Sequence, residues 1–262
     1  MPSNTKLESV DNFEVFLKTL LLFGLAENCK AKKDIFLKNT VAKTASLLGS
    51  ISTLYDSEKY YDGWILYRAL TDRLAHIFYL EEHGSYEAFE KWTYIRDFED
   101  NNKARSDPRF RKVLSDSNFK FDEQQLSRYN QYKKEKPVWK RPDVEAVLKK
   151  EGLDFIYKFG YDYASKHTHP MYNDGNYEFY ALTGLEPNPF RDTDHLALIN
   201  NSLLLATLIT QTCLNFMTLN FRAIVYDYIE SIRLTIENED DSYKLNFLKI
   251  AKLIEQRIGL CK

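Results

Sequence analysis

The chain has 262 residues, of which 44% are hydrophobic and 15% aromatic, enough to bury the core of one domain or of two tightly packed subdomains. The formal net charge of −2 excludes a protein that is basic throughout and binds nucleic acid by charge alone, although it allows a local basic patch. Three widely spaced cysteines without a CxxC pair exclude a disulfide framework and a thiolate zinc site, so we expect a cytoplasmic protein.

Helical periodicity dominates the first third of the chain. Apolar residues recur at the spacing of an amphipathic helix over residues 10–28 and again over 35–54. The next stretch, 60–83, is richer in apolar and aromatic residues than a solvated helix would be. Within it Arg68, Asp72 and His76 are four residues apart and share one face. Because charges buried without partners are costly, we expect a second polar segment to meet this row.

The window 96–150 differs in composition from the rest of the chain. It holds fifteen Lys or Arg against ten Asp or Glu, three prolines and only short amphipathic pieces, which predicts short helices joined by loops. One interpretation is a solvated charged excursion. In the other, basic residues beside aromatic ones form a lid that brings an anionic substrate to the site. The residues assigned to substrate binding are Lys133, Lys134, Lys140 and Arg141.

The second polar row lies in residues 153–170. Tyr161, Ser165 and His169 are again four residues apart, and Pro170 places His169 at or just beyond the end of its helix. We predict that the two rows face each other, since each supplies the polar partners that the other needs. On a continuous helix His167 would point away from His169.

The last third begins with a turn-rich link over residues 171–190. Residues 196–221 carry no charge over a length that could span a bilayer, but ten Ser, Thr, Asn or Gln residues make them too polar to face lipid. We therefore predict a buried helix that continues to about residue 232, a last helix over 242–259, and no membrane segment. The N-terminal residues lack the basic start of a secretory signal and are expected to form the first helix.

No alternating pattern long enough to build a β-sheet occurs in the sequence. The predicted fold is all-α, a bundle of several long helices with short helices in the connections. We expect a single domain over residues 1–262, in which 96–150 is a charged insertion or lid. Residues 191–262 would form a C-terminal helical part that packs on the core.

The aromatic helix that carries Arg68 and an acid four residues later, followed by the Tyr-x-x-x-Ser-x-x-x-His row, resembles the prokaryotic family of unknown function numbered 5677. The resemblance runs from about residue 51 to 170 and implies a helical fold with a site at these positions. In that family the acid is usually glutamate, so Asp72 is a shorter variant. A more distant likeness is to HEPN-type helical proteins, many of which are ribonucleases of bacterial toxin and phage-defence systems, and it implies RNA as a partner. Ser165 stands roughly where their motif has an arginine.

Metal-independent cleavage of RNA is the first function that fits these residues. It needs a base for the 2′-hydroxyl, a cation for the charge that develops on phosphorus and an acid for the leaving oxygen. We assign the acid or base to His169 and the phosphate clamp to Arg68, which Asp72 would hold in place. Tyr161 or Ser165 would position the scissile group.

Two other functions stay open. In a metal-dependent hydrolase, a divalent transition metal would be held by Asp72, His76, His167 and His169, although Arg68 beside them would repel a cation. In a non-catalytic helical module, the protein would bind a ligand, a protein partner or a second copy of itself. The two rows would then be a buried hydrogen-bond network that fixes the register of the helices.

Overall fold

The molecule is all-α, as predicted. A computed structural model describes residues 4–26, 29–110, 121–172, 175–185, 195–219, 222–238 and 249, and every element in these ranges is helical. The chain divides into two compact units. We call Met1–Tyr79 with Pro142–Lys262 the helical bundle, and Leu80–Arg141 the α5–α7 hairpin. The predicted insertion, 96–150, overlaps the hairpin over 96–141.

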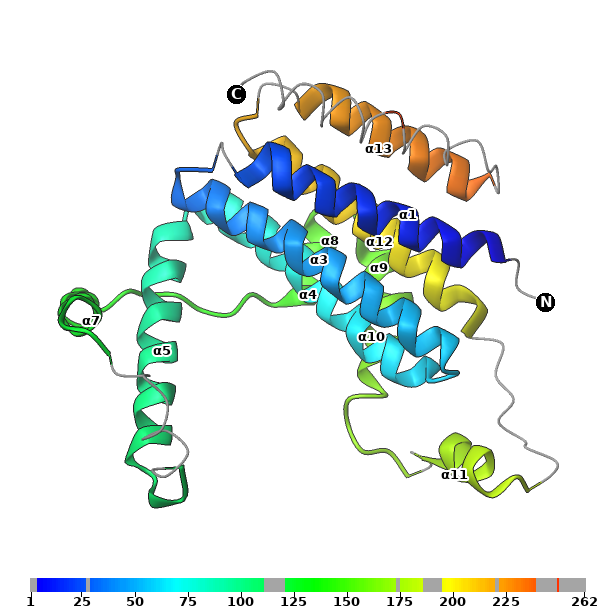
Figure 1. Cartoon of the computed structure of the whole chain (residues 1–262), viewed down its shortest axis with the longest axis horizontal. Coiled ribbons are helices and arrows are strands. Elements are labelled where there is room, and N and C mark those ends of the chain that lie inside the picture. The colour runs from blue at the N-terminus through cyan, green and yellow to red at the C-terminus, as the bar shows by residue number, and fades with distance from the viewer. Residues whose placement is uncertain are drawn as a thin grey trace. The chain divides into compact units, whose positions relative to one another are not determined.

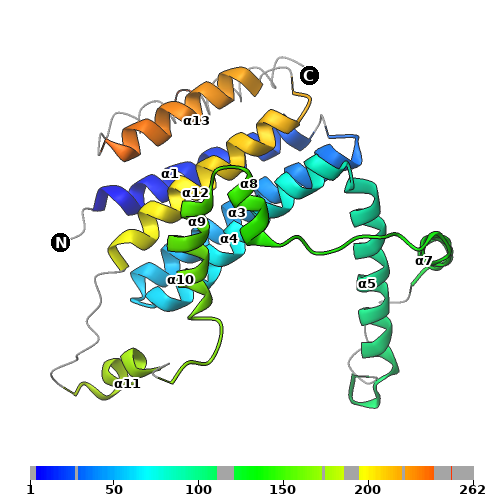
Figure 2. The ribbon, with the colours of Figure 1, turned by 180° about the vertical axis from the view of Figure 1, so that it is seen from behind.

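Long helices make up most of the helical bundle. They are α1 (Asn4–Leu20) with the π-helical turn η1 (Leu21–Leu25), α3 (Lys32–Asp56), α4 (Tyr60–His83), α12 (His195–Phe216) and α13 (Arg222–Glu237). α3 packs against α1 and α12, and α12 also contacts α1 and α13. α4 lies along α3 in both views of the ribbon (Figures 1 and 2).

Aliphatic side chains fill the space between these helices. Each fully buried leucine or isoleucine contributes about 1.5–3 kcal/mol relative to an exposed one. Such a core fixes the rotation of each helix about its axis, because a turned helix would expose its apolar stripe. The fully buried members include Leu17, Leu20, Leu37, Leu48, Ile51, Leu70, Leu74, Leu198 and Ile209.

The uncharged helix α12 buries several polar side chains, and some of them are satisfied by its own backbone or by α13. The hydroxyls of Thr210 and Thr212 each donate to the carbonyl four residues earlier, at 2.8 Å. Gln211 donates from Nε2 to Oε2 of Glu230 on α13 at 2.6 Å. The segment Ala197–Phe216 has a mean hydropathy of 1.4 and is long and apolar enough to cross a membrane, but 72% of it is buried within the protein.

The predicted single helix from about 192 to 232 is wrong, because α12 ends at Phe216 and α13 begins at Arg222. Nη1 of Arg222 donates to the carbonyl oxygens of Asn215 at 3.3 Å and Met217 at 3.1 Å. The arginine thus satisfies carbonyls that the end of α12 leaves open. The predicted last helix, 242–259, lies outside the described residues except for residue 249.

Short elements connect Pro142 to α12. They are α8 (Val144–Lys150), α9 (Asp154–Ile156), the π-helical turn η2 (Tyr157–Tyr161), α10 (Asp162–Ser165) and α11 (Asn176–Thr183). α9, η2 and α10 follow one another directly and carry the second polar row. No residue of α11 is fully buried.

The α5–α7 hairpin pairs α5 (Tyr86–Ser106) with α7 (Glu123–Glu135). The ring of Phe98 stacks on Phe121 and on Tyr129, with 4.0 Å between ring centres in both pairs. The indole of Trp139 contacts the rings of Phe89 and Trp92 at 4.7 and 4.6 Å. Aromatic contacts therefore provide much of the hairpin's packing.

Candidate functional site

α4 positions the first polar row. Its apolar face is fully buried at Leu70, Leu74 and Ile77, which holds the helix in one rotation. Gly63 allows a close approach to α12, because a Cβ at this position would lie 2.5 Å from Cδ2 of Leu198. Arg68 and the acid four residues later are half-buried on one face of this helix.

The second row comes from a segment whose helical geometry changes along its length. η2 has π-helical hydrogen bonds, which turn the following side chains relative to an α-helix and are frequent at functional sites. Gly160 in this turn packs on Tyr67, where a Cβ would lie 2.6 Å from the tyrosine hydroxyl oxygen. α10 ends at Ser165, so His169 lies beyond a turn and does not continue the row along a helix face.

Arg68 donates to two hydroxyl groups of this segment. Its Nη1 donates to Oγ1 of Thr168, and its Nη2 donates to the hydroxyl of Tyr161 at 3.3 Å. The guanidinium carbon also lies 4.9 Å from the centre of the Tyr161 ring, within cation–π range. The Tyr161 hydroxyl in turn donates to Oδ1 of Asp72 at 3.3 Å. We call Arg68, Asp72, Tyr161 and Thr168 the Arg68 cluster.

No acid in the described part of the chain forms an ion pair with Arg68. Its partners there are two neutral hydroxyls and one aromatic ring, and the Tyr161 hydroxyl bridges it to Asp72. A guanidinium has five N–H donors, so three remain for a further acceptor. A half-buried guanidinium without a direct ion pair and with donors left over is suited to an anion from outside the chain.

The side chains of two predicted site residues form hydrogen bonds with backbone carbonyls four residues earlier. Oγ of Ser165 donates to the carbonyl of Tyr161 at 2.7 Å. Nδ1 of His76 lies 2.7 Å from the carbonyl oxygen of Asp72, and because a carbonyl only accepts, Nδ1 carries the proton. Each of these bonds runs to a backbone carbonyl of the same segment, and neither reaches a side chain of the Arg68 cluster.

The two histidines after Ser165 lie in different surroundings. The ring of His167 stacks on Tyr61 of α4 at 4.5 Å and meets Tyr163 edge to face at 5.1 Å. His169 is exposed, and none of the described residues forms a hydrogen bond or ring contact with it. The turn after α10 therefore packs His167 against α4 and leaves His169 on the surface.

The alternative metal ligands Asp72, His76, His167 and His169 are not gathered at one point. Within the described ranges, no three His, Cys, Asp or Glu side chains are placed to hold a metal ion. The carboxylate of Asp72 accepts from a tyrosine, and Nδ1 of His76 bonds a backbone carbonyl. The surroundings of Arg68 suit an anion better than a cation.

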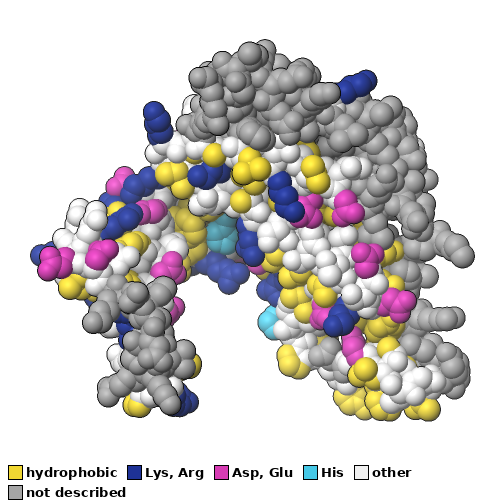
Figure 3. All heavy atoms as spheres, in the orientation of Figure 1, with side chains coloured by type: hydrophobic (Ala, Val, Ile, Leu, Met, Phe, Trp, Pro, Cys, Tyr) yellow, Lys and Arg dark blue, Asp and Glu magenta, His cyan; other side chains and the backbone are white. Residues whose placement is uncertain are grey.

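The residues assigned to substrate binding lie on the hairpin, where Lys133 is already engaged. Its Nζ donates to the Tyr129 hydroxyl at 2.6 Å and to Oε1 of Glu99 at 3.1 Å, and both bonds raise the pKa of the lysine. Lys134, Lys140 and Arg141 are exposed. Side chains of both charge signs lie side by side over α5 and α7 on the face seen in Figure 3. On this face the hairpin's basic side chains are mixed with acidic ones.

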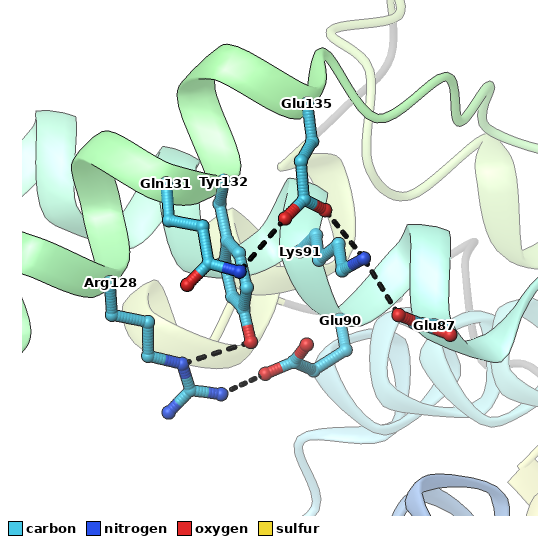
Figure 4. A network of polar contacts seen from close by, with 7 residues as sticks. All are labelled: Glu87, Glu90, Lys91, Arg128, Gln131, Tyr132 and Glu135. Carbon is cyan, nitrogen blue, oxygen red and sulfur yellow. Dashed lines mark hydrogen bonds and ion pairs between the residues drawn. The ribbon is translucent and has the colours of Figure 1, made fainter.

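Several other charged residues of the hairpin form a network between α5 and α7 (Figure 4). Nζ of Lys91 lies 2.7 Å from Glu87 and 2.6 Å from Glu135. Arg128 donates to the Tyr132 hydroxyl at 3.1 Å and forms an ion pair with Glu90. Its guanidinium also lies 4.6 Å from the centre of the Tyr94 ring. The interleaved basic and aromatic residues of this window therefore hold the two helices together.

Thr168 and Tyr61 take part in the contacts between α4 and the second polar segment, although neither belongs to a predicted polar row. Thr168 is seven residues after Tyr161, about two helical turns, so its position was a signal that it could share a face with that tyrosine. Tyr61 is seven residues before Arg68 on α4, in the same relation. Neither was predicted, because the predicted rows contain only residues that are four apart.

The fold and the site together define a class: all-helical proteins in which two polar segments meet at a half-buried arginine held by hydroxyl groups. The chain belongs to the family of unknown function DUF5677, which matches residues 34–179. This range includes the whole Arg68 cluster and confirms the resemblance seen in the sequence. No curated protein and no solved structure gives a significant match to the chain. The likeness to HEPN-type proteins stays a prediction.

Proposed function

We propose that this protein binds a phosphate-bearing ligand at the Arg68 cluster, and that binding is the function the geometry supports best. The observation that carries the proposal is the environment of Arg68. Thr168 and Tyr161 hold its guanidinium in place, while no carboxylate among the described residues forms an ion pair with it. The site therefore supplies a fixed positive charge that a ligand can neutralise.

The chemistry of the cluster favours an anion over a neutral ligand. The proton of the Thr168 hydroxyl goes to the carbonyl of Ser165 at 2.8 Å, and the proton of Tyr161 goes to Asp72. Both hydroxyl protons are therefore committed, and the donors left over in the cluster belong to the guanidinium. Guanidinium groups match the oxygens of a phosphate in geometry, and hydrogen bonds to a charged group contribute about 1.5–3 kcal/mol each.

Titration with inorganic phosphate by calorimetry tests the proposal. Arg68→Gln should weaken phosphate binding at least about 10-fold, the equivalent of about 1.4 kcal/mol. Arg73→Gln is a matched control, because Arg73 is half-buried on the same helix but donates to the carbonyl of Ala69 at 2.6 Å. The control should bind phosphate as the wild type does. Equal affinities in the two variants, or no binding by the wild-type protein, would contradict the proposal.

A second candidate, favoured by the bridging position of Tyr161, is the metal-independent cleavage of RNA. In this reaction the 2′-oxygen attacks phosphorus, and its proton would pass to the Tyr161 oxygen as Tyr161 releases its own proton to Asp72. Arg68 would stabilise the charge on the phosphorane. His169 keeps its predicted role as the acid that protonates the leaving 5′-oxygen. The role of an effector in toxin or phage defence belongs to this candidate.

Incubation of cellular RNA with the purified protein and a chelator separates the two candidates. For the nuclease, Tyr161→Phe and His169→Ala should each slow cleavage by about 10²-fold or more, the usual contribution of a general acid or base. His169→Ala is the cleaner variant, because this exposed side chain has no contact in the described structure that its loss would disturb. Phosphate binding without RNA cleavage would leave binding as the function.

A further inference from the structure

Two neighbouring residues of the turn after α10 contact two different groups on α4. His167 stacks on the ring of Tyr61, and Thr168 accepts from Arg68. Consecutive Cα atoms are about 3.8 Å apart, so the aromatic contact and the cationic contact are neighbours along the turn. The turn therefore contacts an aromatic ring and a guanidinium of α4 through consecutive residues.

The helix places the same two groups within reach of one small ligand. Tyr61 and Arg68 are seven residues apart on α4, which is about two turns and about 10 Å along the axis. The arginine side chain is the longer one, and helical side chains lean toward the N-terminus, so both groups are within the span of one nucleotide. Tyr61 is half-buried, so part of its surface remains accessible.

A ring from a weakly anchored element now contacts Tyr61. Tyr177 of α11 meets it edge to face, with 5.3 Å between ring centres and an interplanar angle of 86°. α11 has no fully buried side chain, and Phe179 and Leu182 on it are 54% and 88% exposed. Exchanging the Tyr177 contact for another ring would therefore expose little core.

We infer that the ligand of the Arg68 cluster is a nucleotide, with its phosphate on Arg68 and its base against Tyr61 in the place of Tyr177. The inference rests on the proposed function, because it uses the same arginine. A nucleotide offers the two groups that the site presents together, an anionic phosphate and a flat base. Stacking on an aromatic side chain tolerates any base, so the site would recognise the class of nucleotides and not one sequence.

Calorimetric titration with adenosine 5′-monophosphate and with inorganic phosphate, each on the full chain, tests the inference. The wild-type protein should bind the nucleotide about 10-fold more tightly than phosphate, as expected for one stacked base. Tyr61→Leu should remove this preference, so that the variant binds the nucleotide no more tightly than it binds phosphate. Tyr79→Leu, a change of another half-buried tyrosine near the other end of α4, should keep it. Tyr177→Ala should strengthen nucleotide binding, because it removes the competing ring.

The outcomes separate this inference from the proposed function. Equal affinities of the wild-type protein for the nucleotide and for phosphate would overturn the inference and leave phosphate binding intact. Binding of neither compound would overturn both. A preference that survives Tyr61→Leu would overturn the assignment of the base to Tyr61. Weaker nucleotide binding by Tyr177→Ala would overturn the exchange of rings.

Discussion

Arg68 in the bundle and Arg128 in the α5–α7 hairpin both lie near tyrosines, yet among the described residues only Arg128 forms an ion pair with an acid. Arg128 donates to Tyr132, lies over the ring of Tyr94 and forms an ion pair with Glu90. Arg68 has only hydroxyls and a ring as partners within the described structure. Where an acid balances the arginine, the pair joins two helices. Where none does, the charge remains available to a ligand.

The two units that contain these arginines also differ in how they are packed. The bundle has a large aliphatic core, whereas the buried residues of α5 and α7 are all aromatic: Tyr86, Phe98 and Tyr132. The hairpin joins its helices through stacked rings and through the ion pairs of Figure 4. Its stability should therefore respond to aromatic and charge substitutions that leave the bundle unchanged.

Phe98→Ala should give the largest difference between the two units. Its ring stacks on Phe121 and Tyr129, both at 4.0 Å, and removal of a buried phenylalanine costs about 3–5 kcal/mol. Hydrogen exchange followed by mass spectrometry should show lost protection over 80–141 and retained protection in α3 and α12. Leu74→Ala is the converse variant and should lower protection in the bundle. Equal losses in both units from Phe98→Ala would mean that they unfold as one.

The same substitution at the two arginines should affect phosphate binding at one position and the stability of the hairpin at the other. Arg68→Gln should weaken phosphate binding about 10-fold or more, because it removes the charge of the site. Arg128→Gln should leave phosphate binding unchanged and lower the stability of the hairpin by about 1 kcal/mol, since its ion pair is partly exposed. Calorimetry and urea unfolding monitored by hydrogen exchange measure the two effects. Loss of phosphate binding in Arg128→Gln would contradict the comparison.

Thr168→Val should have a smaller effect on the same binding site. The substitution keeps the shape of the side chain but removes the oxygen that accepts from Arg68, so the guanidinium is less well held. A hydrogen bond of about 1 kcal/mol corresponds to about 5-fold weaker phosphate binding. Thr168→Ser keeps the hydroxyl and should restore wild-type affinity in the same titration. A serine variant as weak as the valine variant would show that Thr168 acts through packing.

The sequence predicted the elements with strong periodicity better than the connections between them. The predicted helix over 60–83 coincides with α4, because its apolar stripe and polar row follow one helical period. The π-helical turn η2 could not be predicted from a spacing of four, since one extra residue in a turn shifts every later side chain. As a result, Thr168 bonds Arg68 while His169 is exposed.

The charged window shows a second limit of sequence reasoning. Lysines and arginines between aromatic residues are typical of a nucleic-acid surface and of a helix pair joined by cation–π contacts. What separates the two is the position of the acids, and Glu90 and Glu99 come from α5 while their basic partners come from α7. That pairing depends on how two helices lie side by side, which the spacing of residues along one chain does not determine.

Acidification should produce the smallest of the expected differences. In the hairpin it acts through Glu99, and in the bundle Arg233 and Gln211 likewise lower the pKa of Glu230. The bond from Lys133 lowers the pKa of Glu99, so below about pH 4.3, the ordinary value for glutamate, the folded hairpin binds fewer protons than the unfolded chain. The stabilisation is therefore complete above that pH and is lost as the pH falls through the lowered pKa. The effect is small because both side chains are partly exposed, 59% for Lys133 and 33% for Glu99. Hydrogen exchange between about pH 6 and 3 should show residues 80–141 loosening, and Glu99→Gln should flatten this dependence in the hairpin and leave that of the bundle unchanged. An unchanged acid response of residues 80–141 in Glu99→Gln would contradict a stabilising role of the Lys133–Glu99 pair.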